Sequence, residues 1–389
     1  MLESTSSPIY LDYHATTPVD SRVVQKILHH MTEDFGNASS IDHESGHRAA
    51  TAVKHAAQQV AELTGSSPRE IIWTSGATES INLAIQGSLT PNPEKPYRIA
   101  LLPIEHKAVL DTCKMYAKKE WAELIYLEVD SKGRLRLDHL EEVCTQDLSL
   151  LCIMAANNEI GNIYPIQAIG KIAQRHNIPF LCDASQAVGK IPINFEEWGI
   201  TYLAISAHKL YGPQGVGALL VRNGYRLEPM IFGGGHQREM RSGTLNVPGI
   251  VGLGEACQLR SIEMEDDEKA IAIRRDRLQK LLCDRIPNLV VNGDECDRLA
   301  GNLHISIPGI PNSAVIARVR HKLGISTGSA CSSGVEASSH VLRSLGLAAD
   351  IIEGALRIGI GKFTTDNEIE EAAEILIDAI QQIQLRLQA

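Results

Sequence analysis

The sequence predicts an α/β protein in which a mostly parallel, doubly wound sheet is followed by a smaller α+β domain. Short apolar runs alternate with helical patterns as far as about residue 225, as in a parallel sheet with helices on both faces. A long helical pattern then extends from Pro248 to Cys283, and strand-like residues 302–307 and a closing helix from Asp366 follow it. A chain of 389 residues exceeds the size at which one core stops growing, so we expect two domains.

The first candidate site element is a turn of small residues that follows the apolar run 71–73. Residues 74–82 read Thr-Ser-Gly-Ala-Thr-Glu-Ser-Ile-Asn and lead into a helical pattern. The N–H groups in the first turn of such a helix, together with a threonine hydroxyl, can bind a phosphate, which makes Ala77 and Thr78 candidate phosphate-binding residues. A plain N-cap without a ligand would need the same residues, so the turn alone leaves both interpretations open.

The second candidate element is Asp183, which follows the apolar residues 178–182. This run predicts a buried strand, and the carboxylate would emerge at its carboxyl end, where open α/β sheets bind their ligands. A buried carboxylate at such a place is suited to pair with the protonated ring nitrogen of pyridoxal phosphate. Gln186 lies one helical turn further on, within reach of a ring substituent.

The third candidate element is Lys209, in the run 206–217, which reads Ser-Ala-His-Lys-Leu-Tyr-Gly-Pro-Gln-Gly-Val-Gly. A lysine can form a Schiff base with a carbonyl cofactor when burial or a nearby cation lowers its pKa, and Ser206 and His208 are placed to bind a phosphate beside it. A surface lysine before a turn would have similar neighbours. Lys209 and Asp183 each end an apolar strand, however, and this combination predicts a pyridoxal phosphate site.

With these motifs the chain resembles the cysteine desulfurases, pyridoxal phosphate enzymes of the class V aminotransferase group. The matching segments, in chain order, are residues 10–18, 36–40, 75–79, 105–106, 157–161, 183–186, 206–217, 241–244 and 326–331. The resemblance implies a large pyridoxal phosphate-binding domain with a seven-stranded sheet, formed by residues 16–262. It also implies a small domain, formed by residues 1–15 and 263–389, that carries Cys331.

The activity implied by the resemblance is conversion of L-cysteine to L-alanine, with a persulfide formed on Cys331. The persulfide sulfur would pass to an acceptor or iron–sulfur scaffold protein, for cluster, thio-cofactor or tRNA biosynthesis. Cys331 lies among small, polar residues 326–333, which favour an exposed loop, whereas most of the other seven cysteines lie in apolar or helical surroundings. Two alternatives stay open: a selenocysteine or cysteine-sulfinate lyase that does not require Cys331, and a noncatalytic sulfur-carrier or scaffold subunit.

The resemblance also assigns roles to single residues. It makes Lys209, Cys331 and His106 catalytic, with the His106 imidazole stacked on the cofactor ring. Thr244 is expected to reach the cofactor phosphate of the neighbouring subunit, which requires a homodimer. The cofactor-binding residues expected are Ala77, Thr78, His106, Asn158, Asp183, Gln186, Ser206, His208, Lys209 and Thr244. The substrate-binding residues expected are Arg357, Asn158 and Asn37, of which Arg357 would hold the substrate carboxylate through two parallel hydrogen bonds.

The H-E-x-x-H pattern of zinc proteases occurs at residues 43–47, but we expect no metal site there. Gly46 weakens the helix that would have to hold both histidines on one face, and no third ligand is evident nearby. We expect a loop that leads into a helix over residues 49–63. Cluster ligation is expected only transiently, through Cys331 in a complex with a partner protein.

Composition excludes several other classes of protein. The net charge of −10 argues against nonspecific nucleic-acid binding, and no basic patch with aromatic residues is present. No apolar run reaches the roughly 18 residues that span a bilayer, and the N-terminal residues lack the features of a signal peptide. Eight scattered cysteines without a disulfide pattern are typical of a reducing compartment, so we expect a cytoplasmic protein.

Overall fold

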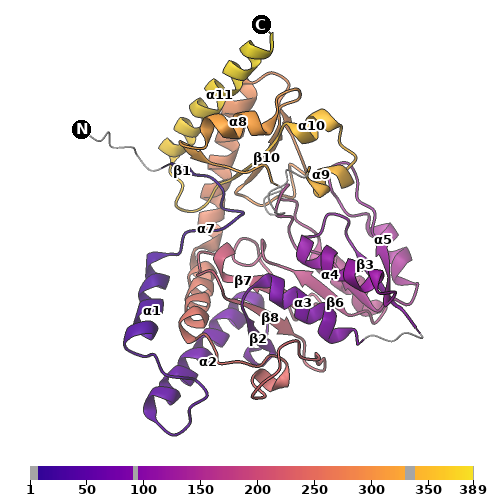
Figure 1. Cartoon of the computed structure of the whole chain (residues 1–389), viewed down its shortest axis with the longest axis vertical. Coiled ribbons are helices and arrows are strands. Elements are labelled where there is room, and N and C mark those ends of the chain that lie inside the picture. The colour runs from indigo at the N-terminus through magenta and orange to yellow at the C-terminus, as the bar shows by residue number, and fades with distance from the viewer. Residues whose placement is uncertain (1–7, 91–94, 329–337, 389) are drawn as a thin grey trace.

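A seven-stranded sheet forms the centre of the larger part of the molecule, in the order β2-β8-β7-β6-β5-β3-β4 (Figure 1). The computed structural model describes residues 8–90, 95–328 and 338–388. Of these seven strands only β8 runs in the direction opposite to the other six, so the predicted mostly parallel α/β sheet is confirmed. The strands are β2 (Ile71–Thr74), β3 (Tyr97–Leu101), β4 (Ala122–Tyr126), β5 (Leu150–Cys152), β6 (Phe180–Asp183), β7 (Tyr202–Ser206) and β8 (Gly217–Val221).

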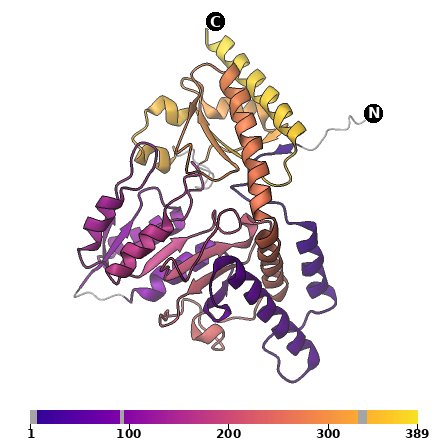
Figure 2. The same ribbon diagram turned by 180° about the vertical axis from the view of Figure 1, so that it is seen from behind.

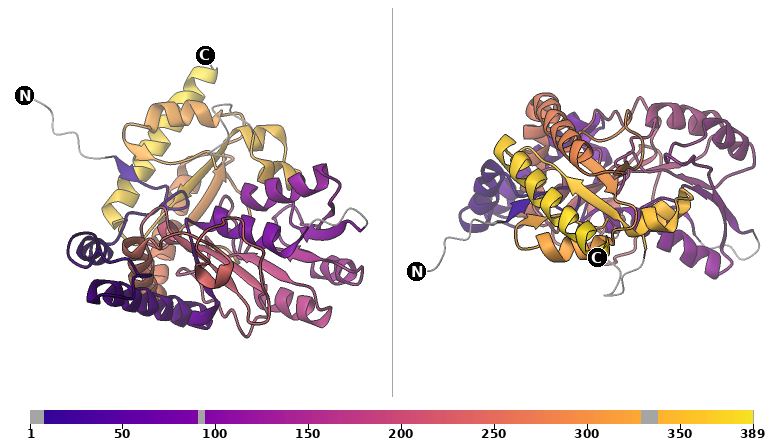
Figure 3. Two further views of the ribbon diagram at one scale, coloured as in Figure 1. Left: turned by 60° about the horizontal axis from the view of Figure 1, so that its bottom comes forward. Right: turned by 90° about the horizontal axis from the view of Figure 1, so that it is seen from above.

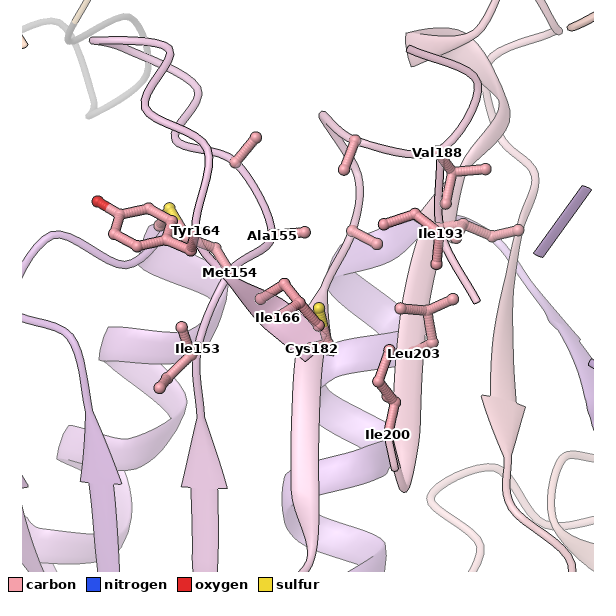
Figure 4. Close-up of a cluster of buried hydrophobic side chains, with 14 of the residues drawn as sticks. Ile153, Met154, Ala155, Tyr164, Ile166, Cys182, Val188, Ile193, Ile200 and Leu203 are labelled. Carbon is pink, nitrogen blue, oxygen red and sulfur yellow. The ribbon is translucent and has the colours of Figure 1, made fainter. Parts of the chain in front are cut away.

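Helices cover both faces of this sheet because its strands are apolar on both sides. Leu181 of β6 packs in one buried cluster with α3 (Ala77–Ser88) and α4 (Lys107–Lys118). Its neighbour Cys182 packs in another cluster with α5 (Leu137–Cys144) and α6 (Ile166–Arg175). Figure 4 shows part of this second cluster, with Cys182 of β6 beside Leu203 of β7. The alternation of side chains along each strand therefore produces three layers.

A smaller part of the structure is built on two short sheets. Strands β9 (Val290–Val291), β10 (Asn302–Ser306) and β12 (Ala355–Gly359) form an antiparallel sheet, and β1 (Ile9–Tyr10) pairs in parallel with β11 (Leu323–Gly324). In Figure 3 the indigo strand β1 accordingly lies among the orange and yellow elements of the C-terminal part. Helices α8 (Asn312–Val319) and α11 (Asp366–Gln388) pack in the core of this part. The buried residues of α9 (His340–Ser344) and the partly buried Ile352 of α10 (Ala349–Glu353) pack with the core of the large sheet.

One helix, α7 (Val247–Arg285), passes from the larger part of the molecule to the smaller part (Figure 2). Its buried residues as far as Leu259 belong to the core that covers the large sheet, and from Ile271 onward they belong to the core of the small sheets. The sequence predicts a boundary between the two domains after residue 262. This position falls within α7, and the domain boundary stays a prediction.

Helices α1 (Ser21–Thr32) and α2 (Glu44–Thr64) pack against α7, and α2 begins earlier than the sequence suggests. The expected loop up to residue 48 was wrong, because His43 caps the helix by accepting a hydrogen bond from the backbone N–H of Gly46 at 3.1 Å. Glycine is required at position 46 because a Cβ atom there would lie 2.0 Å from the backbone oxygen of Ser40. The glycine that seemed to weaken the helix is the residue that lets it pack.

Because α2 and α7 are in close contact at Gly254, we expect a larger side chain at this position to destabilise the fold. A Cβ atom at Gly254 would lie 2.7 Å from the Cα atom of Ala56 in α2, so the two helices would have to separate. We expect Gly254→Ala to lower the free energy of unfolding by about 1–3 kcal/mol, as measured by urea denaturation. The matched control is Ile262→Ala on the exposed face of α7, where the side chain is 70% exposed. Equal stability of Gly254→Ala and the natural protein would contradict the close packing.

Candidate active site

A cavity of about 500 Å³ lies at the carboxyl ends of β6 and β7, beside the beginning of α3. Its lining brings together residues that are far apart in the sequence, as the topology of a doubly wound sheet requires. The sequence-predicted residues that line it are Ala77, Thr78, His106, Asn158, Asp183, Gln186, Ser206, His208, Lys209 and Arg357.

One end of the cavity is suited to a phosphate. Helix α3 begins after Gly76, whose φ of +151° favours glycine, and no side chain caps the N–H groups of the first turn. The hydroxyl of Ser206 lies beside this turn, 3.6 Å from where a Cβ atom of Gly76 would be. Backbone N–H groups, the Thr78 side chain and the Ser206 hydroxyl are therefore available to an anion at one place.

His208 lies at the same end of the cavity in its neutral form. Its Nδ1 is 3.1 Å from the hydroxyl oxygen of Thr16. Burial lowers the pKa of His208 to about 4, and the nearby cations Lys209 and Lys190 add to this effect. The neutral ring can donate a hydrogen bond to a phosphate without itself carrying charge.

Asp183 and Lys209 face the cavity from adjacent strands. Asp183 ends β6, where it is paired in register with Ala204 of β7, and its Oδ1 accepts a hydrogen bond of 3.0 Å from the backbone N–H of Ser185. Lys209 follows β7, and its Nζ donates to the backbone oxygens of His14 at 2.7 Å and Ala15 at 2.6 Å. The two groups that the sequence assigned to the cofactor therefore share one cavity.

Arg357 and Asn158 also line the cavity. The Arg357 side chain is 3% exposed, its Nη2 is 2.7 Å from Oδ1 of Asp12, and its Nη1 donates to the backbone oxygen of Asn158 at 3.0 Å. The Nε of Arg357 has no hydrogen-bond partner among the described residues. The guanidinium is thus oriented by Asp12 and keeps N–H donors, among them that of Nε, for an anionic ligand.

His106 occupies the N-cap position of α4 and lines the cavity. Its Nδ1 accepts a hydrogen bond of 3.1 Å from the backbone N–H of Ala108. The neutral ring therefore carries its proton on Nε2. The capping role fixes the ring at the edge of the cavity, where a flat ligand could stack on it.

Three of the expected residues are not brought into this cavity by the described part of the chain. Asn37 is exposed, and its Oδ1 accepts a hydrogen bond from the backbone N–H of Ser39. Thr244 is exposed and does not line the cavity of its own chain. Cys331 lies outside the described residues, although Gly328, just before it, lines the cavity.

Several residues that line the cavity were not predicted from the sequence to belong to the site. Examples are His14, Met154 and Gln214. His14 belongs to the segment 10–18 that carried part of the family resemblance, and that was the available signal. No group of three metal-binding side chains occurs among the residues that the structure describes. In the same described part, no helix is both long and apolar enough to cross a bilayer.

Comparison with known proteins agrees with this fold. The family profile "Aminotransferase class-V" matches residues 9–371. The chain therefore belongs to the class-V aminotransferase family, whose members use pyridoxal phosphate.

Individual relatives narrow the identification within this family. "Cysteine desulfurase IscS" of Anaeromyxobacter sp. (strain Fw109-5) is 42% identical over 379 residues, which cover 97% of this chain and 93% of that protein. A solved structure described as "NIFS-LIKE PROTEIN" has a TM-score of 0.89 at 34% identity and covers 96% of this chain and 99% of that one. "SspA in complex with cysteine" has a TM-score of 0.80 at 32% identity, with coverage of 92% and 100%. These full-length similarities make the chain a cysteine desulfurase.

The residues around the cavity fit pyridoxal phosphate. The uncapped first turn of α3 matches its phosphate, Asp183 matches a protonated ring nitrogen, and Lys209 matches its carbonyl group. The cavity of about 500 Å³ also leaves room for a small amino acid beside the cofactor.

A buried carboxylate, Glu159, lies next to the cavity. Its side chain accepts a hydrogen bond from the hydroxyl of Ser339, and its Oε2 lies 3.3 Å from where a Cβ atom of Gly328 would be. Burial raises the pKa of Glu159 to about 7, although the Ser339 hydrogen bond and the charge of Arg357 oppose the rise. This carboxyl therefore takes up a proton at a pH where an exposed glutamate stays ionised.

The raised pKa of Glu159 predicts a pH dependence of stability. Because the folded pKa of about 7 exceeds the usual value of 4.5, the folded state binds more protons between these values, and the free energy of unfolding falls as the pH rises through this range. We expect Glu159→Gln to reduce that fall, measured between about pH 5 and about pH 8, by about 1–3 kcal/mol. The exposed Glu371→Gln serves as control. An unchanged pH profile in Glu159→Gln would show that Glu159 stays ionised.

Proposed function

We propose that this chain releases sulfur from L-cysteine as L-alanine and a persulfide on Cys331, using pyridoxal phosphate held in the cavity. The observation that carries the proposal is the convergence of Lys209, Asp183 and Arg357 on one cavity. Lysine and aspartate are the groups that this cofactor requires, and an oriented arginine is suited to the carboxylate of an amino acid.

The cofactor-binding residues proposed act at three places. The first turn of α3 with Ala77 and Thr78, together with Ser206 and His208, binds the phosphate. Asp183 accepts the hydrogen bond of the ring-nitrogen proton, and His106 stacks on the ring. Asn158 and Gln186 donate hydrogen bonds near the ring oxygen, while Lys209 binds the carbonyl carbon. When bound, pyridoxal phosphate supplies an electron sink beside the α-carbon of the substrate.

The substrate-binding residues orient L-cysteine, and Lys209 moves the proton of its α-carbon. Arg357 holds the substrate carboxylate, with Asn158 beside it. Asn37, which is exposed and does not line the cavity of its own chain, is kept as a proposed further contact of the substrate. The Lys209 amine, once displaced by the substrate amine, takes the proton from the α-carbon and later returns a proton to the product. Asp12 keeps the Arg357 guanidinium in place, since it is 2.7 Å from Nη2.

Sulfur transfer requires Cys331 as nucleophile. Its thiolate attacks the sulfur of L-cysteine, so that a sulfur–sulfur bond forms and the carbon–sulfur bond breaks. The bonding electron pair of the broken bond stays with the carbon fragment, which takes up a proton and leaves as L-alanine. The balance is L-cysteine plus a Cys331 thiol giving L-alanine plus a Cys331 persulfide, from which an acceptor or scaffold protein takes the sulfur.

The proposal includes a homodimer in which Thr244 completes the neighbouring site. Thr244 is exposed and lies outside its own cavity. The nearby Phe232 is 82% exposed, and its neighbour Ile231 accepts a hydrogen bond from the backbone N–H of Ser242. An exposed aromatic residue next to the Thr244 segment is suited to burial against a second subunit.

The proposal also places the protein in the cytoplasm. All seven described cysteines are free thiols, of which Cys283 and Cys296 are exposed. Exposed thiols and a reactive persulfide are compatible with a reducing compartment.

Removal of Cys331 separates the desulfurase from the lyase alternative. We expect Cys331→Ala to keep the cofactor absorbance and to lose L-alanine release from L-cysteine, because no thiolate remains to attack the sulfur. Cysteine sulfinate, which can lose its sulfur group without such an attack, should still be turned over. The matched control is Cys296→Ala, which removes an exposed cysteine that does not line the cavity. Unchanged cysteine turnover by Cys331→Ala would support the lyase, and a natural protein with neither cofactor absorbance nor turnover would support the scaffold alternative.

Mixed dimers test the role of Thr244. We expect Lys209→Ala to lower turnover by at least about 100-fold, because it removes both the cofactor link and the base. We expect Thr244→Asp to be impaired through charge repulsion of the cofactor phosphate. When equal amounts of the two variants are unfolded together and refolded, about half of the dimers contain one chain of each variant. If Thr244 completes the neighbouring site, each mixed dimer has one intact site, so about a quarter of all sites become active. If Thr244 acted on its own chain, the mixture would stay inactive.

A further inference from the structure

We propose that His14 is a further substrate-binding residue, whose Nε2 accepts a hydrogen bond from the amino group of the substrate. The inference rests on the proposed function, and it adds the group that recognises the substrate amine. His14 is 2% exposed and lines the cavity.

Gln186 fixes the tautomer of His14. The Gln186 Nε2 donates a 2.9 Å hydrogen bond to the backbone oxygen of His14, which sets the orientation of the amide. The Gln186 Oε1 is then an acceptor, 3.2 Å from the Nδ1 of His14, and Lys190 Nζ donates to the same oxygen at 2.9 Å. Since an acceptor faces Nδ1, the proton of a neutral His14 must be on Nδ1.

The other ring nitrogen of His14 is left as a lone-pair acceptor. Nε2 has no hydrogen-bond partner among the described residues although it is buried. Burial lowers the pKa of His14 well below its usual range, and the nearby Lys190 and Arg357 lower it further. A buried polar atom without a partner costs free energy, so an unpaired acceptor on a residue that lines the cavity is suited to a donor that arrives with the ligand.

Of the polar groups of L-cysteine, the amino group is the one that we expect to donate a hydrogen bond to Nε2 of His14. The substrate carboxylate is only an acceptor and cannot donate to Nε2, and Arg357 is available to it. The Lys209 Nζ lies 2.7 Å from the backbone oxygen of His14. A substrate amine that replaces the lysine amine therefore arrives near residue 14.

The test compares two ligands, of which only one carries an amino group. L-alanine carries an amine and a carboxylate but no thiol, and 3-mercaptopropionate carries a thiol and a carboxylate but no amine. Affinities for both are measured by titration calorimetry on the cofactor-loaded protein. We expect His14→Phe and His14→Leu, which lack the acceptor, to bind L-alanine about 3- to 10-fold more weakly and 3-mercaptopropionate with unchanged affinity.

Two further variants separate this role from a structural one. His14→Asn keeps an oxygen acceptor and should recover part of the affinity for L-alanine. The matched control is His304→Phe, because His304 is equally buried, also has an unpartnered Nε2, and does not line the cavity. This control should leave both affinities unchanged even where it lowers the thermal unfolding temperature.

Several outcomes would overturn the inference. Unchanged binding of L-alanine by both His14→Phe and His14→Leu, or equal weakening of both ligands, would show that His14 does not recognise the amine. Selective weakening of 3-mercaptopropionate would assign Nε2 to the thiol instead. If the natural protein turns over L-cysteine, these outcomes in the variants overturn the inference about His14 alone. If the natural protein neither turns over L-cysteine nor binds L-alanine, the proposed function is overturned as well.

Discussion

The hydrogen bonds made by residues 12–17 hold the cavity together. Asp12 contacts Arg357 across 345 positions of sequence, and the backbone oxygens of His14 and Ala15 accept from Lys209 across 195 and 194 positions. The hydroxyl oxygen of Thr17 accepts a 2.8 Å hydrogen bond from the backbone N–H of Tyr211. Closing such long loops costs entropy, so the site is complete only when the large sheet, the small sheets and this segment have all assembled.

The turn after Lys209 is strained, and the same segment stabilises it. Tyr211 has a φ of +67°, which is unfavourable for a residue with a bulky side chain. Besides the contact with Thr17, its hydroxyl accepts a hydrogen bond of 3.0 Å from the backbone N–H of Lys362. Buried packing thus keeps the chain in a conformation that directs Lys209 into the cavity.

Cations in the cavity and close to it favour anionic ligands. Arg260 is fully buried, donates to the backbone oxygen of Gly189, and is paired with Asp267 and Glu268. Lys190 is half-buried, and its charge contributes to the lowered pKa values of His14 and His208. The histidines stay neutral beside these cations, and Lys209 and Arg357 line the cavity, so the local charge favours a phosphate and a carboxylate although the chain as a whole has a net charge of −10.

The sequence by itself determined the layers and the two central cofactor groups. Apolar strands alternating with helices predict a parallel sheet, and side chains that follow such strands, Asp183 and Lys209, must meet at one edge because parallel strands end together. Only the tertiary structure placed Asp12 and His14, since contacts across 345 and 172 positions leave no local pattern. It also decided that Gly46 belongs to a helix, because the close approach of Ser40 that requires glycine exists only after folding. Thr244 and Asn37 lie outside the cavity of a single chain, so no folded monomer could assign their roles.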